Sequence, residues 1–265
     1  MSEIVVTRLL TTAVKGMRIR EVESISLSRT GARGNRAFYV IDDRGRMVNG
    51  KVVRNLQVVV PDYDPDTGRL TLTFPDGSQV DGTVAYGDTI ETQFFGLHHT
   101  VPEVLGPWAE AISEFFGRPL RLVASPTAVD RGVAGTASIV SCGSLRRLAE
   151  QAEQSGVDAR RFRMLIEIDG VAPYEEDSWV DSQVRVGPAL LRMRGHVGRC
   201  LITSRDPETA AVDLPTLDLL ARYRREVQST EPLPFGIYGE VLEGGSVRLG
   251  DTVAVCEPAA VAAER

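Results

Sequence analysis

The chain has 265 residues, of which 43% are hydrophobic and 25% are charged, and its net charge is −6. This length allows one large domain or two small ones with a real core. The negative balance gives no global basic character, so we expect no nucleic-acid partner. No run approaches the roughly 20 apolar residues that span a bilayer, and the start, MSEIVVTRLL, lacks the basic leader of a signal peptide. We therefore expect a cytoplasmic protein without membrane contact.

The three cysteines are widely spaced and form no CxxC motif; they are Cys142, Cys200 and Cys256. This pattern argues against a disulfide framework and against a structural zinc or iron–sulfur site. It fits a reducing compartment.

The first hundred residues are predicted to form short strands. VESISLS (22–28) alternates apolar and polar residues, the period of a half-buried strand. RAFYVIDDRGRMVNG (36–50) predicts a strand, a turn at 43–45 and a returning strand, and GRLTLTFPDGSQV (68–80) repeats the pattern. Short strands with regular turns indicate a barrel or a sandwich.

The pattern changes near residue 100. Proline and glycine boundaries with apolar residues on one face predict helices over 106–117, 144–156 and 215–225. Strand-like pieces lie between and beyond them, at 118–125, 164–169, 189–195, 199–204 (RCLITS) and 245–255. The predicted fold class is α+β, mostly β. A β-barrel-like domain would span 1–100 and a second barrel with flanking helices 101–258, with a frayed tail at 259–265.

Cys200 can be a small core residue, a nucleophile or a metal ligand. A cysteine with apolar neighbours is usually a core residue. Arg199 and Arg194 could instead favour its thiolate. On a strand, residues 196, 198 and 200 share a face, so His196 could reach Cys200 and form a Cys/His nucleophile.

Two further segments could carry chemistry through polar side chains. His98 and His99 could bind metal, but adjacent strand residues point to opposite faces, so we expect a loop there. PYEEDSW (173–179) offers paired carboxylates, or is simply a solvated loop.

Two segments could bind an anion. RGVAGTAS (131–138) is a small-residue loop that could cradle phosphate through backbone N–H groups. DARRFRML (158–165) would place Arg161 and Arg163 on one face of a strand, which suits a phosphate or carboxylate. A solvated edge explains these arginines equally well.

Several segments together resemble a known family. TTAVKGMRIREVESISLSRTGARGNRAFYVIDDRGRMV (11–48) resembles the N-terminal β-barrel domain of MOSC proteins, named after the C-terminal domain of molybdenum cofactor sulfurase. DARRFRMLIEIDG (158–170) and PYEEDSWVDSQVRVGPALLRMRGHVGRCLITSRDPETA (173–210) resemble the MOSC domain itself. The resemblance runs from about residue 4 to residue 255, in a layout similar to the mitochondrial amidoxime-reducing components and their bacterial counterparts.

The resemblance implies a set of site residues. The cysteine of the RC motif, Cys200, would be the molybdenum ligand and the catalytic position, which suits a soft thiolate. Lys15, Arg36 and Arg163 would face the pterin phosphate. The full set of implied cofactor contacts is Lys15, Arg36, Ala134, Gly135, Thr136, Ser138, Arg163, Arg199, Phe235 and Gly236.

The chain departs from the family pattern at four positions. Met164 and Leu165 replace the proline and asparagine of RFRPN, and Leu165 cannot make the hydrogen bond expected of asparagine. Gly16 stands where serine often follows the lysine. Gly198 stands before RC, where proline or serine is common.

The resemblance implies an oxidoreductase that carries the molybdenum cofactor (Mo-molybdopterin) and reduces N-hydroxylated small molecules. Pyridoxal phosphate is not expected. Electrons would come from a separate protein of ferredoxin, flavoprotein or cytochrome type, because the chain shows no iron–sulfur or flavin motif. His196 and the acids of 173–179 are candidate proton donors. Two alternatives stay open: a sulfur carrier or sulfurtransferase that uses a Cys200 persulfide, and a non-catalytic cofactor-binding protein.

Overall fold

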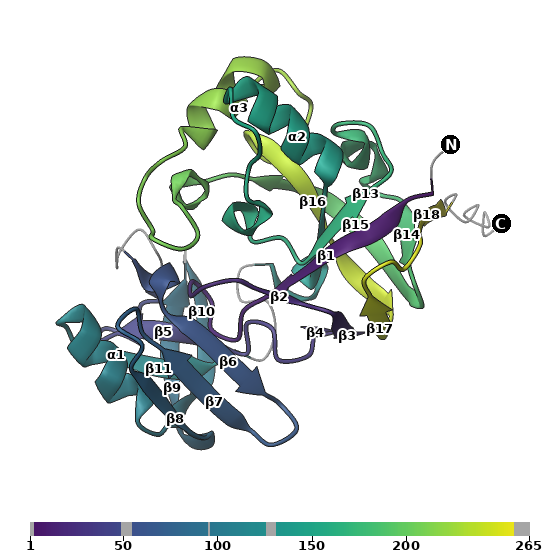
Figure 1. Cartoon of the computed structure of the whole chain (residues 1–265). Coiled ribbons are helices and arrows are strands. Elements are labelled where there is room, and N and C mark those ends of the chain that lie inside the picture. Colours follow the sequence, from purple (N-terminus) through teal and green to yellow (C-terminus); the bar gives the residue numbers. More distant parts are fainter. Residues whose placement is uncertain (1–2, 49–54, 95, 126–130, 257–265) are drawn as a thin grey trace.

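The computed structural model describes residues 3–48, 55–94, 96–125 and 131–256. The expected tail at 259–265 and the end of the expected returning strand at 49–50 lie outside these ranges. Figure 1 shows two halves, one that carries α2 and α3 above one that carries α1. In agreement with the predicted class, the fold is α+β and mostly β.

The upper half is built on one large mixed sheet. Within the described ranges its eight strands follow the order β18 (Val253–Cys256), β14 (Gln183–Val186), β15 (Ala189–Gly198), β16 (Pro234–Glu243), β12 (Ala137–Ser141), β13 (Ile166–Asp169), β1 (Val5–Thr11) and β2 (Arg20–Val22). β12 and β13 run parallel, and the other neighbours are antiparallel. The strands that bear Ser138 and the segment before Cys200 thus flank β16 on its two sides.

The remaining strands form three smaller sheets among the residues that the structure covers. The four-stranded sheet has the order β5 (Phe38–Asp42), β11 (Leu120–Ala124), β10 (Leu97–Leu105) and β9 (Ala85–Phe94). One three-stranded sheet has the order β17 (Gly245–Arg248), β3 (Ser24–Ser28) and β4 (Gly31–Ala32). The other has the order β6 (Val60–Asp64), β7 (Arg69–Thr73) and β8 (Gln79–Thr83).

The helices are short. In the described part of the chain they are α1 (Trp108–Phe116), α2 (Cys142–Gln151) and α3 (Thr216–Arg224). The 3₁₀ turns are η1 (Leu56–Val58), η2 (Gly132–Gly135), η3 (Ala159–Phe162), η4 (Glu175–Trp179) and η5 (Leu201–Ser204). The three predicted helices are therefore confirmed, with shifted ends.

The start of the chain belongs to the upper half. β1 pairs with β13, and β3 pairs with β17. Val6 and Leu9 are buried in one core with Ile166 and Ile168. Hydrophobic alternation within residues 1–30 predicts strands but not their partners, which lie more than 150 residues away.

The lower half extends past residue 100. β10 pairs with β9 and with β11, and β11 pairs with β5. Trp108 and Ile112 of α1 are fully buried in one core with Val14 and Phe38. The chain therefore changes halves after β11, later than the sequence pattern indicates.

Two local predictions were wrong, and a third was confirmed over most of its length. RCLITS is not a strand, because Leu201–Ser204 forms η5. The described part of the returning segment near Met47 makes two isolated bridges, Met47 to Ile41 and Arg46 to Gln93, rather than a strand. The strand predicted over 22–28 is confirmed as β3 with the expected alternating burial, although residue 22 belongs to β2.

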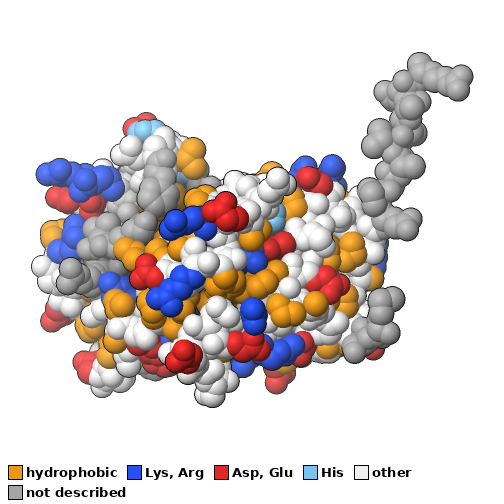
Figure 2. Space-filling view, turned by 90° about the horizontal axis from the view of Figure 1, so that it is seen from above, with side chains coloured by type: hydrophobic (Ala, Val, Ile, Leu, Met, Phe, Trp, Pro, Cys, Tyr) orange, Lys and Arg blue, Asp and Glu red, His pale blue; other side chains and the backbone are white. Residues whose placement is uncertain are grey.

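The surface seen in Figure 2 mixes acidic and basic side chains rather than separating them into areas of one sign. Among the described residues, no helix is both long and apolar enough to cross a membrane.

Candidate functional site

A cavity of about 350 Å³ lies where the two halves meet, and Cys200 is part of its wall. The lower half contributes residues between 15 and 94, and the upper half contributes residues between 131 and 238. The lining residues are Lys15, Gly16, Arg36, Met47, Val48, Phe94, Arg131, Gly135, Ser138, Phe162, Arg163, Met164, Val197, Gly198, Arg199, Cys200, Ile202 and Tyr238. We call this space the Cys200 cavity.

Cys200 lies just beyond the end of β15 and is the N-cap residue of η5. Its backbone carbonyl accepts hydrogen bonds from the Thr203 N–H (3.1 Å) and the Thr203 hydroxyl (3.0 Å). The residue is exposed rather than packed in a core. The interpretation of Cys200 as a core residue is therefore wrong, and its thiol is accessible to a ligand.

The Arg199 guanidinium is fixed by hydrogen bonds before any ligand arrives. Nε donates to the Phe235 carbonyl (2.9 Å) and Nη1 to the Phe162 carbonyl (2.8 Å). The group lies over the Phe162 ring, 5.2 Å from its centroid. Burial lowers the pKa of Arg199 to about 9, with Cys200 acting in the opposite direction. A desolvated cation of this kind favours a negative partner.

Arg36 and Arg163 form a linked pair in the wall. Arg36 Nη2 donates to the Arg163 carbonyl (2.8 Å), and Arg163 Nη2 donates to the Met17 carbonyl (2.7 Å). Burial and the charge of Arg36 lower the pKa of Arg163 to about 9. Both residues have left-handed backbones, with φ of 53° and 55°. Such strained positions concentrate at functional sites.

The lysine of the cavity, Lys15, follows the bridge between Val14 and Phe38. Its Nζ lies 5.4 Å from the centroid of the Phe94 ring. Gly16 has φ of 92°, and a Cβ there would lie 2.7 Å from Leu56 Cδ2. The serine of the family pattern is thus disfavoured here by the backbone and by a core leucine.

Six of the ten implied cofactor contacts line one cavity together with the implied metal ligand Cys200: Lys15, Arg36, Gly135, Ser138, Arg163 and Arg199. The other four implied residues lie behind or beside it. Thr136 lines a neighbouring cavity, and Ala134 lies in η2 without lining either. Phe235 is fully buried and stacks on Phe162, with ring centroids 4.3 Å apart. A Cβ on Gly236 would lie 2.7 Å from the Ile139 carbonyl.

The neighbouring cavity has a volume of about 320 Å³ and shares Arg36, Gly135 and Ser138 with the Cys200 cavity. Leu165 lines this second space and not the first. Its backbone N–H donates to the Ser138 hydroxyl (2.9 Å). Met164 is the member of the altered RFRML segment that reaches the Cys200 cavity, and Arg199 Nη2 contacts its sulfur at 2.9 Å.

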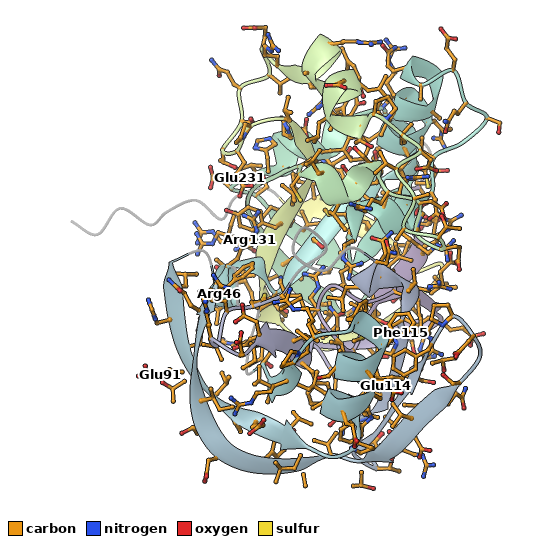
Figure 3. The ribbon with its side chains drawn as sticks, turned by 90° about the vertical axis from the view of Figure 1, so that its left-hand side faces the viewer. Arg46, Glu91, Glu114, Phe115, Arg131 and Glu231 are labelled. Carbon is orange, nitrogen blue, oxygen red and sulfur yellow. The ribbon has the colours of Figure 1, made fainter. Side chains whose placement is uncertain are left out.

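Sequence reasoning missed an ion pair at the cavity. Arg131 pairs with Glu231, with Nη2 and Oε2 3.0 Å apart, and lies over the Tyr238 ring at 4.1 Å. Figure 3 shows the two side chains next to each other at the junction of the halves. Glu231 Oε2 also accepts the Gly198 N–H (2.9 Å). Proline at 198 would lose that donor, and a Cβ would lie 2.8 Å from the carboxylate.

The expected Cys/His pair is not formed. His196 is buried in β15, its backbone N–H donates to the Thr230 hydroxyl (2.8 Å), and its Nδ1 accepts from the Thr230 N–H (3.3 Å). It is not part of the lining of the Cys200 cavity. Because Cys200 lies beyond the end of the strand, the shared face expected for 196, 198 and 200 does not exist.

Of the acids of 173–179, Glu175 is exposed, Glu176 and Asp177 are held by buried partners, and none of the three lines the Cys200 cavity. Glu176 is fully buried and accepts hydrogen bonds from the Ser141 and Ser144 hydroxyls at 2.8 and 2.7 Å, at the start of α2. Asp177 pairs with the buried Arg224. These carboxylates hold η4 against α2 and α3, so they are wrong as proton donors for the Cys200 cavity.

The remaining candidates are also separated from the site. His98 and His99 lie on β10 rather than in a loop. Arg161 lies in η3, not on a strand face with Arg163, and pairs with Asp213 at 2.5 Å. Residues 131–138 begin with η2 and provide Gly135 and Ser138 to the wall.

The donor set of the Cys200 cavity fits the molybdenum cofactor. A soft thiolate suits a metal that already carries two sulfur ligands, and cationic groups suit its phosphate. Within the part of the chain described, no group of three or more His, Cys, Asp or Glu could hold a metal by itself.

Two family models cover nearly the whole chain. The MOSC N-terminal beta barrel domain matches residues 3–119, and the MOSC domain matches residues 127–254. The chain belongs to the MOSC family.

Known proteins resemble the chain at low identity. Mitochondrial amidoxime-reducing component 1 of Xenopus laevis is 24% identical over 94% of this chain and 81% of its own length. Molybdenum cofactor sulfurase of Oryza sativa subsp. japonica is 25% identical over 92% of this chain but only 34% of its own length. The crystal structure of the YuaD protein from Bacillus subtilis aligns with a TM-score of 0.46 and 11% identity, over 95% and 94% of the two chains.

Proposed function

We propose that the chain binds the molybdenum cofactor in the Cys200 cavity, with Cys200 as the metal ligand, and reduces N-hydroxylated small molecules. The observation that carries the proposal is the meeting of one exposed thiol with desolvated cations in a single cavity. Burial lowers the pKa of both Arg163 and Arg199 to about 9. Such groups favour an anionic ligand, and the thiol favours a soft metal.

The roles of the residues follow from their positions. Lys15, Arg36 and Arg163 would hold the phosphate, and Cys200 Sγ would donate to the metal. Arg199 is fixed by the Phe162 and Phe235 carbonyls, so it presents a preorganised positive charge beside that sulfur. The bound cofactor supplies the two-electron chemistry that removes oxygen from nitrogen.

The substrate class comes from the relatives. An amidoxime carries an N–OH group, and two electrons with two protons convert it to N–H and water. The relative from Xenopus laevis is named for this reaction. We propose that the electrons reach this chain from a separate ferredoxin, flavoprotein or cytochrome, and that the reaction takes place in the cytoplasm.

The test measures molybdenum and released pterin per chain after expression in a host that makes the cofactor. We expect near-stoichiometric values for the wild type and for Cys142→Ala, the matched control, and loss of metal in Cys200→Ala. Turnover of benzamidoxime with a chemical reductant is then measured on the same samples. Metal bound equally by Cys200→Ala would overturn the ligand role, and cofactor without turnover of any N-hydroxylated compound would favour a binding protein.

A second function is sulfur transfer through a Cys200 persulfide. The exposure of Cys200 favours it, because a carrier thiol has to reach both a donor and an acceptor. The match to a molybdenum cofactor sulfurase covers only a third of that protein. Mass spectrometry of the Cys200 peptide for one added sulfur atom distinguishes this function, which requires modified thiol and no bound metal.

A further inference from the structure

The segment that follows Cys200 crosses from one half of the molecule to the other. Residues 205–213 come directly after η5, and we call them the strap. An isolated bridge between Arg205 and Val212 closes the base of the strap. Asp206 Oδ1 accepts the N–H groups of Glu208 (3.0 Å) and Thr209 (2.7 Å). The strap is therefore a defined turn rather than a loose connection.

Glu208 at the tip of the strap joins two segments that are distant in sequence. Oε2 lies 2.5 Å from Arg18 Nη1, and Oε1 lies 2.5 Å from Arg160 Nη1. Arg18 Nη2 also donates to the Glu208 carbonyl (2.8 Å). One carboxylate thus connects the chain after β1 to η3.

Further contacts fix the strap on both sides. The Asp206 carbonyl accepts from Gln57 Nε2 (2.5 Å), and Asp213 pairs with Arg161 at 2.5 Å. Ala210 has a left-handed φ of 60° and is 1% exposed. It is buried in the core of the lower half with Val14. The strap therefore inserts into a core to which neither η5 nor β15 belongs.

Two of the segments held by the strap also carry a side chain of the Cys200 cavity. Arg18 is three residues from Lys15, and Arg160 is three residues from Arg163. The strap itself begins five residues after Cys200. A gap of only about 10 Å³ separates the strap from the cavity wall, and Arg163 and Ile202 line both spaces. The strap is the common support of three segments of the wall.

We propose that Glu208 is a positioning residue that sets Lys15 and Arg163 against Cys200. The cations of the wall repel one another when no anion is bound. An exposed ion pair alone contributes little, but this carboxylate holds two segments of the wall at once. The inference rests on the proposed function, because it takes the Cys200 cavity as the anion site.

The test compares binding of inorganic pyrophosphate to the full-length, cofactor-free chain by calorimetry. Glu208→Asp keeps the charge but shortens the side chain, so the carboxylate no longer contacts both arginines. Glu208→Gln keeps the length of the side chain and removes the charge. We expect both to weaken binding about threefold to tenfold, which corresponds to about 0.7–1.4 kcal/mol. A charge effect alone predicts tighter anion binding for Glu208→Gln, so the direction separates positioning from electrostatics.

The control is Glu243→Gln, which removes an exposed pair with Arg185 outside the cavity. It should leave pyrophosphate binding unchanged, and urea unfolding should show that all variants are folded. The same comparison is made for molybdenum and pterin retained per chain. Unchanged binding in Glu208→Asp, or tighter binding in Glu208→Gln, would overturn the inference alone. Wild-type protein that binds neither pyrophosphate nor cofactor would overturn the proposed function as well.

Discussion

Two cysteines of this chain lie in cavities of similar size with different charged surroundings. The Cys200 cavity has about 350 Å³ and is lined by Lys15 and four arginines. A second cavity of about 390 Å³, the Cys142 cavity, lies between α2 and β1 and is lined by Glu167 and Glu150 as well as Arg8 and Arg146. Cys142 Sγ donates to Glu167 Oε1 at 3.0 Å.

The difference shows that the surroundings, not the residue type, decide what a cysteine can do. Burial raises the pKa of Cys142 to about 12, and the charge of Glu167 adds to the shift. Glu167 is itself buried, which raises the pKa of its carboxyl. A thiolate at Cys142 would face a carboxylate, whereas one at Cys200 faces Arg163 and Arg199. Only the second arrangement supports a nucleophile or a metal ligand.

The largest expected effect is the difference in alkylation between the two thiols. At pH 8, a pKa of about 12 leaves only about one Cys142 thiol in ten thousand ionised. We expect iodoacetamide to modify the exposed Cys200 at least about 100-fold faster than Cys142. Peptide mapping by mass spectrometry gives both rates in one sample. Equal rates would remove the contrast between the two cavities.

The next effect concerns the cations. Arg163→Met should weaken pyrophosphate binding about tenfold to a hundredfold, because a charged hydrogen bond contributes about 1.5–3 kcal/mol. Arg8→Met, the matched change in the Cys142 cavity, should have no effect. Calorimetry on cofactor-free protein measures both. Similar losses in the two variants would mean that the anion does not select the Cys200 cavity.

Arg163→Met should also change stability in opposite directions with and without ligand. The pKa of Arg163 is lower in the folded chain than its ordinary value, so the folded state binds this proton less tightly than the unfolded state. At neutral pH the desolvated cationic group therefore opposes folding when the cavity is empty. Urea unfolding should show a stabler variant without pyrophosphate and a less stable one at saturating pyrophosphate.

A smaller effect tests whether the wall of the Cys200 cavity tolerates the family's serine. Gly16→Ser should lower the free energy of unfolding by about 1–2 kcal/mol, because φ is positive and Leu56 occupies the space of the side chain. Gly77→Ser is the control, since Gly77 also has positive φ but nothing within 4 Å of a Cβ. Urea unfolding of both variants separates backbone strain from the clash. A loss of unfolding free energy no larger than that of Gly77→Ser would show that the Leu56 side chain moves aside.

Much of the fold was predictable because its signals are local. Helix boundaries at Pro107 and Gly117, and the alternation of Leu70, Leu72 and Phe74, depend on neighbouring residues only. The pairing of β1 with β13 was not predictable, since hydrophobic alternation identifies a strand but not a partner 160 residues away. Residues 101–124 were expected in the second domain for the same reason, whereas α1 and β11 pack in the lower half.

The candidate site also contains residues that the sequence predicts and residues that it does not. Family motifs placed Lys15, Arg36, Arg163, Arg199 and Cys200 in one cavity. Arg131 and Glu231 were missed because a pair separated by 100 residues leaves no pattern in sequence. His196 was assigned wrongly because the strand ends before Cys200, and strand ends are set by pairing partners. Gly198 was the available signal, since a glycine in place of proline or serine indicates close approach of another group.

The smallest effect tests the carboxylate of the Cys142 cavity. Glu167 has a raised pKa when folded, so the folded chain holds this proton more tightly, and its contribution to stability falls as pH rises above the ordinary value near 4.5. Oε2 of Glu167 has no hydrogen-bond partner, and Arg8 Nη1 lies 3.8 Å away.

Glu167→Gln keeps an acceptor for Cys142 and removes the buried charge. It should therefore stabilise the chain by about 1 kcal/mol at pH 8 and by less near pH 4.5 in urea unfolding. The surface control Glu243→Gln should show no such trend. Destabilisation by Glu167→Gln at pH 8 would mean that Arg8 compensates the buried carboxylate fully, so that burial of this charge in the Cys142 cavity carries no electrostatic cost.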